Sequence, residues 1–151
     1  MGLDCSHNAW YGAYSAFMRW RQKLAEVAGL PPLELMDGFY SSGKYDGVLY
    51  FGQNVEDELW SSKRNRIQET LPISWDCLKP SPLHELLFHS DCEGEIAAHK
   101  CGPIADALEA LIPTLPDEDA GGHIGNWREK TAQFVAGLRA AADAGEALDF
   151  H

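Results

Sequence analysis

The chain has 151 residues, 45% of them hydrophobic, which is enough for one buried core and too few to favour two domains. Its 23 Asp and Glu residues outnumber 12 Lys and Arg, and the formal net charge of -11 disfavours nucleic-acid backbones and anionic membranes as partners. No stretch approaches the roughly 18 apolar residues that span a bilayer, and no basic-then-apolar signal peptide opens the chain, so we expect a cytoplasmic protein.

The first predicted element is a helix over residues 9–28. Apolar side chains recur on one face with helical spacing, and Gly29 followed by Pro31 and Pro32 supplies the end. The apolar stripe consists of Ala13, Phe17, Trp20, Leu24 and Val27.

Trp10, Tyr14 and Arg21 lie on the same side of this helix as the apolar stripe and therefore project toward the protein. An inward arginine needs a partner, which is ordinarily an internal Asp or Glu; a phosphate or carboxylate of a bound ligand is the alternative. Trp10 and Tyr14 offer flat faces for a planar ligand group, although aromatic residues at helical spacing more often belong to the core.

Residues 30–80 are punctuated by Gly, Ser and Pro, and we interpret them as an irregular excursion on the domain. Within it, residues 48–51 alternate as a strand does, and the charged stretch 55–69 is typical of a short helix. The basic run at 63–66 is ordinarily a solvated surface and less often a phosphate-binding one.

The second half of the chain predicts two further helices. Leu83 to Phe88 forms an apolar run that fits either a helix or a buried strand, and both deliver His89 to the end of an element. Gly102 and Pro103 mark a helix start, followed by an apolar stripe over residues 104–112. The last long helix follows Gly121 and Gly122 and ends at Gly145; its stripe is Ile124, Trp127, Thr131, Phe134, Val135, Leu138 and Ala142. These patterns predict a single compact α+β domain with about three long amphipathic helices and a few short strands.

The seven residues from His89 to Glu95 hold an imidazole, a hydroxyl, a thiol and three carboxylates, a set that is costly unless solvated, mutually bonded or bound to a ligand. One interpretation is a metal site in which His89 and Asp91 are ligands and Glu93 or Cys92 completes the set. A second is a binding loop in which His89, Ser90 and Asp91 hydrogen-bond a small molecule. The third is an ordinary turn with a core histidine.

The segment Asp4-Cys5-Ser6-His7 places nucleophile and base types close together at a spacing that has no general catalytic meaning, and its ordinary role is a turn. His123 and Asn126 lie in a glycine-rich approach to a helix N-terminus, which favours anion binding. Cys101 lies beside a predicted helix start, which would lower its thiol pKa. The four cysteines form no CxxC pair, so free thiols are expected.

Three segments carry a family resemblance: MGLDCSH at residues 1–7, HSDCEGEI at 89–96 and GGHIGNW at 121–127. Together they resemble an uncharacterised protein family of actinobacteria and their phages. The resemblance implies a grouping and no reaction. A small acidic phage-associated protein with a polar pocket is similar in kind to the sponges that sequester nucleotide immune signals, by analogy alone.

Our leading hypothesis is a protein that sequesters or senses a small, nucleotide-derived ligand. We expect the ligand-binding residues to be Asp4, Cys5, His7, Trp10, Tyr14, Arg21, His89, Ser90, Asp91, Glu93, His123 and Asn126. The first alternative is a phosphoesterase-like hydrolase with a divalent metal at His89 and Asp91 and Glu93 as general base. The second is a protein-interaction module without a pocket. The pocket hypothesis requires the N-terminal segment and the loop after Phe88 to lie side by side.

Overall fold

The computed structural model describes residues 2–39 and 73–151. The chain divides into two compact units, one made of Met1–Leu30 with Ser81–His151 and the other of Pro31–Pro80. The second unit coincides with the excursion expected at about 30–80. The strand expected at 48–51 and the helix expected at 55–69 lie outside the described residues. That all 151 residues form a single domain stays a prediction.

The first unit is α+β, which confirms the predicted fold class. In chain order its elements are β1 (Gly2–Cys5), β2 (Trp10–Ala13), α1 (Tyr14–Val27), α3 (Leu83–Leu87), β3 (Gly94–Ile96), α4 (Ala98–Leu111), α5 (Trp127–Ala144) and β4 (Leu148–Phe150). As expected, the described part of the chain combines three long helices, α1, α4 and α5, with short strands. None of the helices in these described ranges has the length and apolarity of a membrane span.

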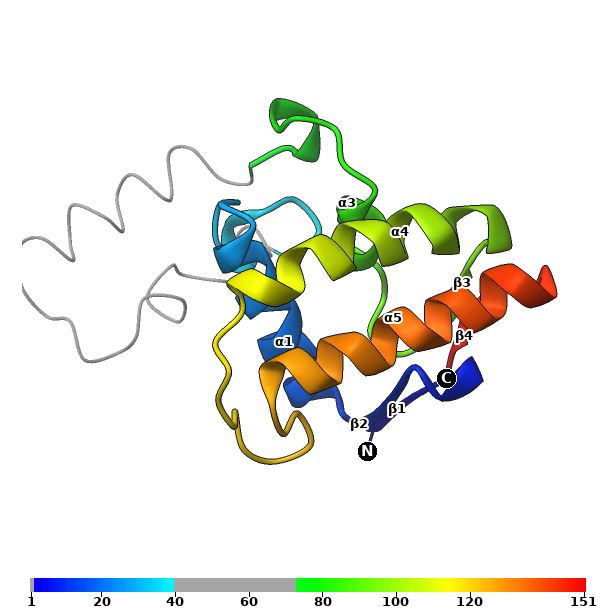
Figure 1. Cartoon of the computed structure of the whole chain (residues 1–151). Coiled ribbons are helices and arrows are strands. Elements are labelled where there is room, and N and C mark those ends of the chain that lie inside the picture. Colours follow the sequence, from blue (N-terminus) through cyan, green and yellow to red (C-terminus); the bar gives the residue numbers. More distant parts are fainter. Residues whose placement is uncertain (1, 40–72) are drawn as a thin grey trace, which may run out of the picture. The chain divides into compact units, whose positions relative to one another are not determined.

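The four strands form an antiparallel sheet in the order β2-β1-β4-β3. The two inner strands, β1 and β4, are far apart in the sequence. They lie side by side near the two marked termini (Figure 1). Phe150 of β4 pairs with Cys5 of β1 on one side and with Gly94 of β3 on the other. Side chains alternate along β1 and β4: Leu3 and Cys5 of β1 and Leu148 and Phe150 of β4 are buried, whereas Asp4 and Asp149 are exposed.

An aromatic cluster joins the sheet to the helices. Trp10 of β2, Phe17 and Trp20 of α1 and Phe134 of α5 pack in sequence, with ring centroids 4.8–6.3 Å apart, and Phe150 of β4 meets Phe17 edge-on at 6.0 Å. All five side chains are buried. Large buried aromatic rings contribute more apolar area per residue than any other side chains, so this cluster is the centre of the core.

Helices α4 and α5 run alongside each other (Figure 1). On the solvent side of this contact, Arg139 of α5 makes ion pairs with Asp106 and Glu109 of α4. Helix α5 begins after Asn126, whose side chain caps it, and ends at Gly145, which adopts a left-handed φ of 68°. The expected stop at Gly145 is thereby confirmed.

Two predicted helix boundaries were wrong. The first helix begins at Tyr14 instead of near residue 9, because Trp10–Ala13 pairs with β1 as a strand. The helix expected to start at Gly102 and Pro103 begins at Ala98, and Pro103 lies inside its second turn. A proline so near the N-terminus removes a single intrahelical hydrogen bond, which a helix tolerates better there than at its middle. The ambiguous run from Leu83 to Phe88 is helix α3 with its C-terminal residue.

In the second unit, the described residues lie in two segments that meet through a parallel bridge between Met36 and Ile73. Each segment contains a short 3-10 helix, Leu33–Leu35 in one and Trp75–Cys77 in the other. The indole Nε1 of Trp75 donates a hydrogen bond to the carbonyl oxygen of Asp37 at 2.9 Å. These contacts join the two described segments of this unit.

Candidate functional site

The larger of two cavities described in the first unit lies between α3 and the N-terminal half of α4 and has a volume of about 430 Å³. We call it the α3–α4 cavity. It is lined by Ser81, Pro82, His84, Glu85, Phe88, His99, Lys100, Pro103 and Ile104. Small-molecule sites in proteins commonly fall between roughly 300 and 1,000 Å³, so this volume suits a small organic ligand.

Helix α3 presents one side to the core and the other to the cavity. Leu83, Leu86 and Leu87 are buried, and Ser81 accepts the backbone N–H of Leu83 at the start of the helix. His84 and Phe88 stand four residues apart, so they share one face, which is the face that lines the cavity. The same spacing places two pairs from α4 on the opposite wall: His99 with Pro103, and Lys100 with Ile104.

The chemistry of this cavity is mostly apolar, with few polar groups. The ring of Phe88 is 45% exposed although its residue type prefers burial. His84 is buried, and desolvation lowers the pKa of its imidazole, so the ring is neutral at pH 7. Lys100 and Glu85 form an ion pair 3.5 Å apart. An apolar wall, a neutral imidazole and a nearby cation together suit a flat ring that carries a polar or anionic group.

A second, smaller cavity of about 210 Å³ lies between the β1–β2 hairpin and His123. It contains two of the predicted ligand-binding residues, Asp4 and His123. The Nδ1 atom of His123 accepts the backbone N–H of Ala13 at 2.7 Å. A side chain at Gly12 would place its Cβ 2.7 Å from the Cβ of His123, so a glycine is required for this close approach. His123 therefore fastens its loop to the hairpin.

The two polar segments singled out in the sequence do lie on one sheet. Strand β4 pairs with β1, which contains Asp4 and Cys5, and with β3, which ends the 89–95 loop. The ring of His89 stacks on Phe150 of β4 with a centroid distance of 4.0 Å. The two segments are thus on one sheet, with β4 between them, and neither of the two cavities described here is lined by both.

The side chains of the 89–95 loop, however, bond mainly to the loop itself. The ring nitrogens of His89 lie 2.8 Å from the carbonyl oxygen of Ser90 and 3.1 Å from that of Glu95. The hydroxyl of Ser90 accepts the backbone N–H groups of Cys92 and Glu93. These contacts are those of an ordinary turn, the third interpretation of this segment.

Metal binding at His89 and Asp91 finds no support in this geometry. Within residues 2–39 and 73–151, no group of three or more His, Cys, Asp or Glu side chains is placed to hold a metal ion. The two ring nitrogens of His89 also face carbonyl oxygens, and a nitrogen that donates a proton to a carbonyl cannot at the same time donate a lone pair to a metal.

Among the described residues, the hydrogen-bond partners of the Arg21 guanidinium include backbone carbonyl oxygens. Its Nη1 donates to the carbonyls of Leu87 at 3.1 Å and His89 at 2.6 Å, which anchors the C-terminal end of α3. Burial lowers the pKa of the guanidinium to about 10, against the opposing charge of Asp91. The structure gives Arg21 this anchoring role in place of phosphate binding.

Other predicted ligand contacts are also part of the core. Trp10 and Cys5 are buried, and Trp10 packs within the aromatic cluster, so neither offers a face to a ligand. Tyr14 is half-buried at the start of α1. Burial raises the pKa of the Cys5 thiol to about 12. It also raises the pKa of Cys101, whose thiol donates to the carbonyl of Ala97, so the lowered pKa expected for Cys101 was wrong.

The anion site expected at the start of the last helix is closed by the protein itself. Asn126 Oδ1 accepts the backbone N–H groups of Arg128 and Glu129, the groups that an anion would need. Its amide nitrogen donates to Asp117. The expectation of anion binding by His123 and Asn126 is therefore corrected: Asn126 is a helix cap and His123 a tether.

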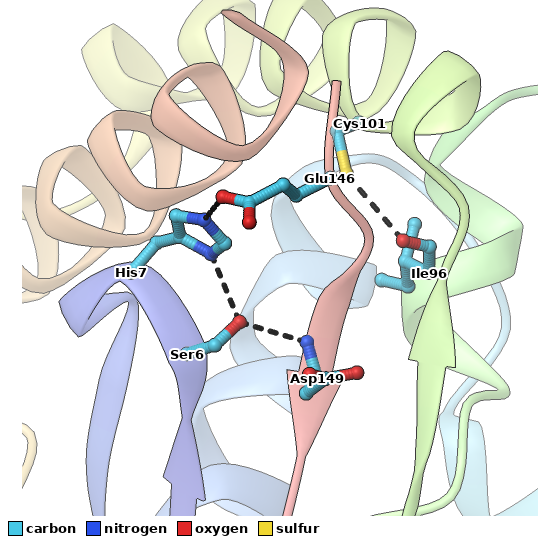
Figure 2. Close-up of polar contacts among 6 residues, drawn as sticks. All are labelled: Ser6, His7, Ile96, Cys101, Glu146 and Asp149. Atoms are coloured by element: carbon cyan, nitrogen blue, oxygen red, sulfur yellow. Dashed lines mark hydrogen bonds and ion pairs between the residues drawn. The ribbon is translucent and has the colours of Figure 1, made fainter. Parts of the chain in front are cut away.

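The structure brings His7 together with two residues that the sequence did not single out as a set. The hydroxyl of Ser6 lies 2.9 Å from Nδ1 of His7, and Nε2 of His7 lies 3.0 Å from Oε1 of Glu146 (Figure 2). We call these three residues the Ser6 relay. Glu146 lies two residues beyond the end of α5, so only the packing of α5 against the N-terminal turn reveals this neighbour.

Neither the protein-family models, the curated proteins nor the solved structures with which the chain was compared match it. The family suggested by the three motifs therefore stays a prediction.

Proposed function

We propose that this protein binds a small organic molecule in the α3–α4 cavity. The observation that carries the proposal is a cavity of about 430 Å³ that exposes the ring of Phe88 beside the neutral imidazole of His84. Solvent-exposed aromatic rings in concave, largely apolar sites are typical of ligand pockets. This location replaces the one first expected, which was built from the N-terminal segment, α1 and the 89–93 loop.

The chemistry of the cavity supports a nucleotide-derived ligand. A base would supply the flat ring that stacks on Phe88, and its edge would hydrogen-bond to the imidazole of His84 or His99. Lys100 is the cation available for a phosphate, and Glu85, its present ion-pair partner, would release it. The strongly negative net charge of the chain makes such a local cation more important for anion capture.

Binding without turnover would make the protein a sequestering or sensing module, and a phage anti-defence sponge is the specific form suggested by analogy with small acidic phage-associated proteins. A cytoplasmic location accompanies this proposal, because nucleotide signals are found there. The four cysteines are all free, which is usual for proteins of a reducing compartment.

The test begins with the purified full-length protein. After heat denaturation, mass spectrometry of the supernatant should detect an intact nucleotide-derived compound, and thermal-shift measurements with a panel of mono-, di- and cyclic nucleotides should identify the class. Phe88→Ala should weaken binding at least about tenfold, because stacking on an aromatic ring contributes about 1–3 kcal/mol per base. Lys100→Glu should weaken binding of phosphorylated ligands more than that of the free base.

Tyr11→Ala is the matched control. Tyr11 is also a highly exposed aromatic residue, 72% accessible, but it lines the smaller cavity and not the α3–α4 cavity. Unchanged affinity in this variant, with loss in Phe88→Ala, would support the proposed site. Loss of binding in Tyr11→Ala alone, or no bound or stabilising compound in any assay, would refute it.

A further inference from the structure

The Ser6 relay is separate from the α3–α4 cavity. Its residues line neither of the two cavities described above. Ser6 and His7 belong to the turn between β1 and β2, and Glu146 precedes β4. Figure 2 shows the three side chains pointing toward one another, with the backbone N–H of Asp149 directed at the hydroxyl of Ser6.

The hydrogen-bond partners of His7 indicate which nitrogen of its neutral ring donates and which accepts. A carboxylate can only accept, so the neutral ring of His7 carries its proton on Nε2 and donates it to Glu146. The Nδ1 lone pair then faces the hydroxyl of Ser6, 2.9 Å away, and accepts its proton. This is the arrangement of a nucleophile, a general base and a group that orients the base.

The hydroxyl oxygen of Ser6 also accepts a hydrogen bond. The backbone N–H of Asp149 lies 2.9 Å from Oγ of Ser6 and can donate only to a lone pair of that oxygen. The O–H proton of Ser6 is thereby left for His7. A donor in this place stabilises the negative charge that forms on Oγ when the proton leaves.

The turn between β1 and β2, which contains Ser6 and His7, has a strained backbone. His7 and Asn8 have φ angles of 58° and 57°, a left-handed conformation that non-glycine residues rarely adopt. Such a conformation is unfavourable and persists only where surrounding contacts hold it. Gln133 of α5 supplies one of them by donating to the carbonyl of Asn8 at 3.0 Å.

The relay is open to solvent at one side. The His7 side chain is 20% exposed and that of Glu146 is 64% exposed. A small molecule can therefore approach the relay from the side of His7 and Glu146 without the core opening.

We propose that Ser6 is an activated nucleophile for acyl transfer from small activated esters. Oγ of Ser6 attacks the ester carbonyl carbon while its proton moves to Nδ1 of His7, and Glu146 stabilises the imidazolium. The bond to the leaving oxygen then breaks, and that oxygen takes the proton from His7. A water molecule, deprotonated by the same ring, hydrolyses the acyl-serine and restores the hydroxyl.

The experiment uses the full chain with a fluorophosphonate probe, which forms a stable adduct with activated serines and releases fluoride. Peptide mapping should place the adduct on Ser6. Ser6→Ala should remove the label, His7→Gln should slow labelling at least about 100-fold, and Glu146→Gln should slow it measurably because the base loses its partner. Hydrolysis of p-nitrophenyl acetate should fall in the same order.

Ser90→Ala is the matched control. Ser90 also lies in an exposed turn next to a histidine, but its hydroxyl accepts backbone N–H groups and faces the thiol of Cys92. Its removal should leave labelling unchanged. Circular dichroism shows whether each variant is folded, and the exposed position of Glu146 makes its variant informative even if Ser6→Ala unfolds. An unlabelled Ser6 in the native chain, or equal labelling rates in the native chain, His7→Gln and Glu146→Gln, would overturn the proposal.

Discussion

Gly137 shows how a single missing side chain sets the distance between two elements. It lies in the middle of α5, where glycine costs stability, yet a Cβ at this position would be 2.4 Å from the Cβ of Ala9 and 2.7 Å from its Cα. A backbone atom cannot move aside as the end of a flexible side chain can. The glycine thus lets the turn that carries the Ser6 relay lie directly on α5.

We predict that Gly137→Ala destabilises the protein despite the better helix propensity of alanine. The matched control is Gly102→Ala in α4, where a Cβ would meet nothing within 4 Å. That substitution should raise the free energy of unfolding by up to about 1 kcal/mol, whereas Gly137→Ala should lower it by about 1–3 kcal/mol. Urea denaturation measures both, and stabilisation by Gly137→Ala would contradict the close packing described.

Individual residues were also where inference from sequence was weakest. The position of Cys101 near a helix start predicted a reactive thiol, but the thiol faces the core, and burial raises its pKa. The inward direction of Arg21 was correct, while its partners, carbonyl groups at the end of α3, could not be inferred from helical spacing. A periodic pattern gives the direction of a side chain, but its partner depends on which element packs opposite.

At the scale of elements, the short helix α3 is held in place by a side chain of α1. Five residues are too few for a stable isolated helix, so its position depends on its buried leucines and on the guanidinium of Arg21 in α1. The Arg21 side chain also lies over the ring of Phe17 at 4.5 Å. The wall of the α3–α4 cavity therefore rests on a contact with α1.

We predict that Arg21→Ala lowers the free energy of unfolding by about 3 kcal/mol, because a cavity opens and buried carbonyls lose a donor. The cost of burying the charge, visible in the pKa of about 10, offsets part of this loss. Arg21→Met should consequently lose less. Arg19→Ala is the control on the same helix, since exposed Arg19 binds a single carbonyl, that of Ala120. Its cost should stay below about 1 kcal/mol, and equal losses in the two alanine variants would refute the anchoring role.

Element types were predictable and some boundaries were not. The stripes of α1 and α5 identified both helices, because a helix that packs on a core must repeat apolar residues every three to four positions. The strand Trp10–Ala13 was missed, since four residues with alternate burial fit a helix start equally well. Only its pairing with β1 decides between the two.

For the whole molecule, the buried imidazole of His84 predicts how stability depends on pH. In the unfolded chain the ring binds a proton near its ordinary pKa of 6.5, but burial lowers that pKa in the folded protein. Below pH 6.5 the unfolded state therefore binds more protons than the folded state. The contribution of His84 to stability is complete above that pH and is lost as the pH falls toward the folded-state pKa.

We expect the free energy of unfolding to fall more steeply between pH 6.5 and pH 5 in the native chain than in His84→Gln. The control is His99→Gln, which removes an exposed histidine from the same cavity and should keep the native slope. Denaturant titrations at several pH values measure the three slopes. Parallel slopes for the native chain and His84→Gln would show that the buried ring does not cause the acid sensitivity.

At this scale the fold class was correctly predicted, whereas the α3–α4 cavity was not among the expected sites. Pairs of cavity residues four positions apart, His84 with Phe88 and His99 with Pro103, were visible in the sequence. Neither pair by itself predicts a cavity, because the cavity exists only where the short helix α3 faces α4. The polar residues His89 and Ser90, which the sequence made conspicuous, bond within their own turn.

The pairing of β1 with β4 has a consequence for how the chain reaches its native state. Each long helix consists of neighbours in sequence and can form as soon as its own residues are available. Strands β1 and β4 can pair only when two segments separated by most of the chain come together. Closing so long a loop costs conformational entropy before any strand contact forms, so this step is slow. We therefore expect the β1–β4 pair to close after the helices have formed, and the Ser6 relay, which joins the β1–β2 turn to the residues around the start of β4, to form together with that pair.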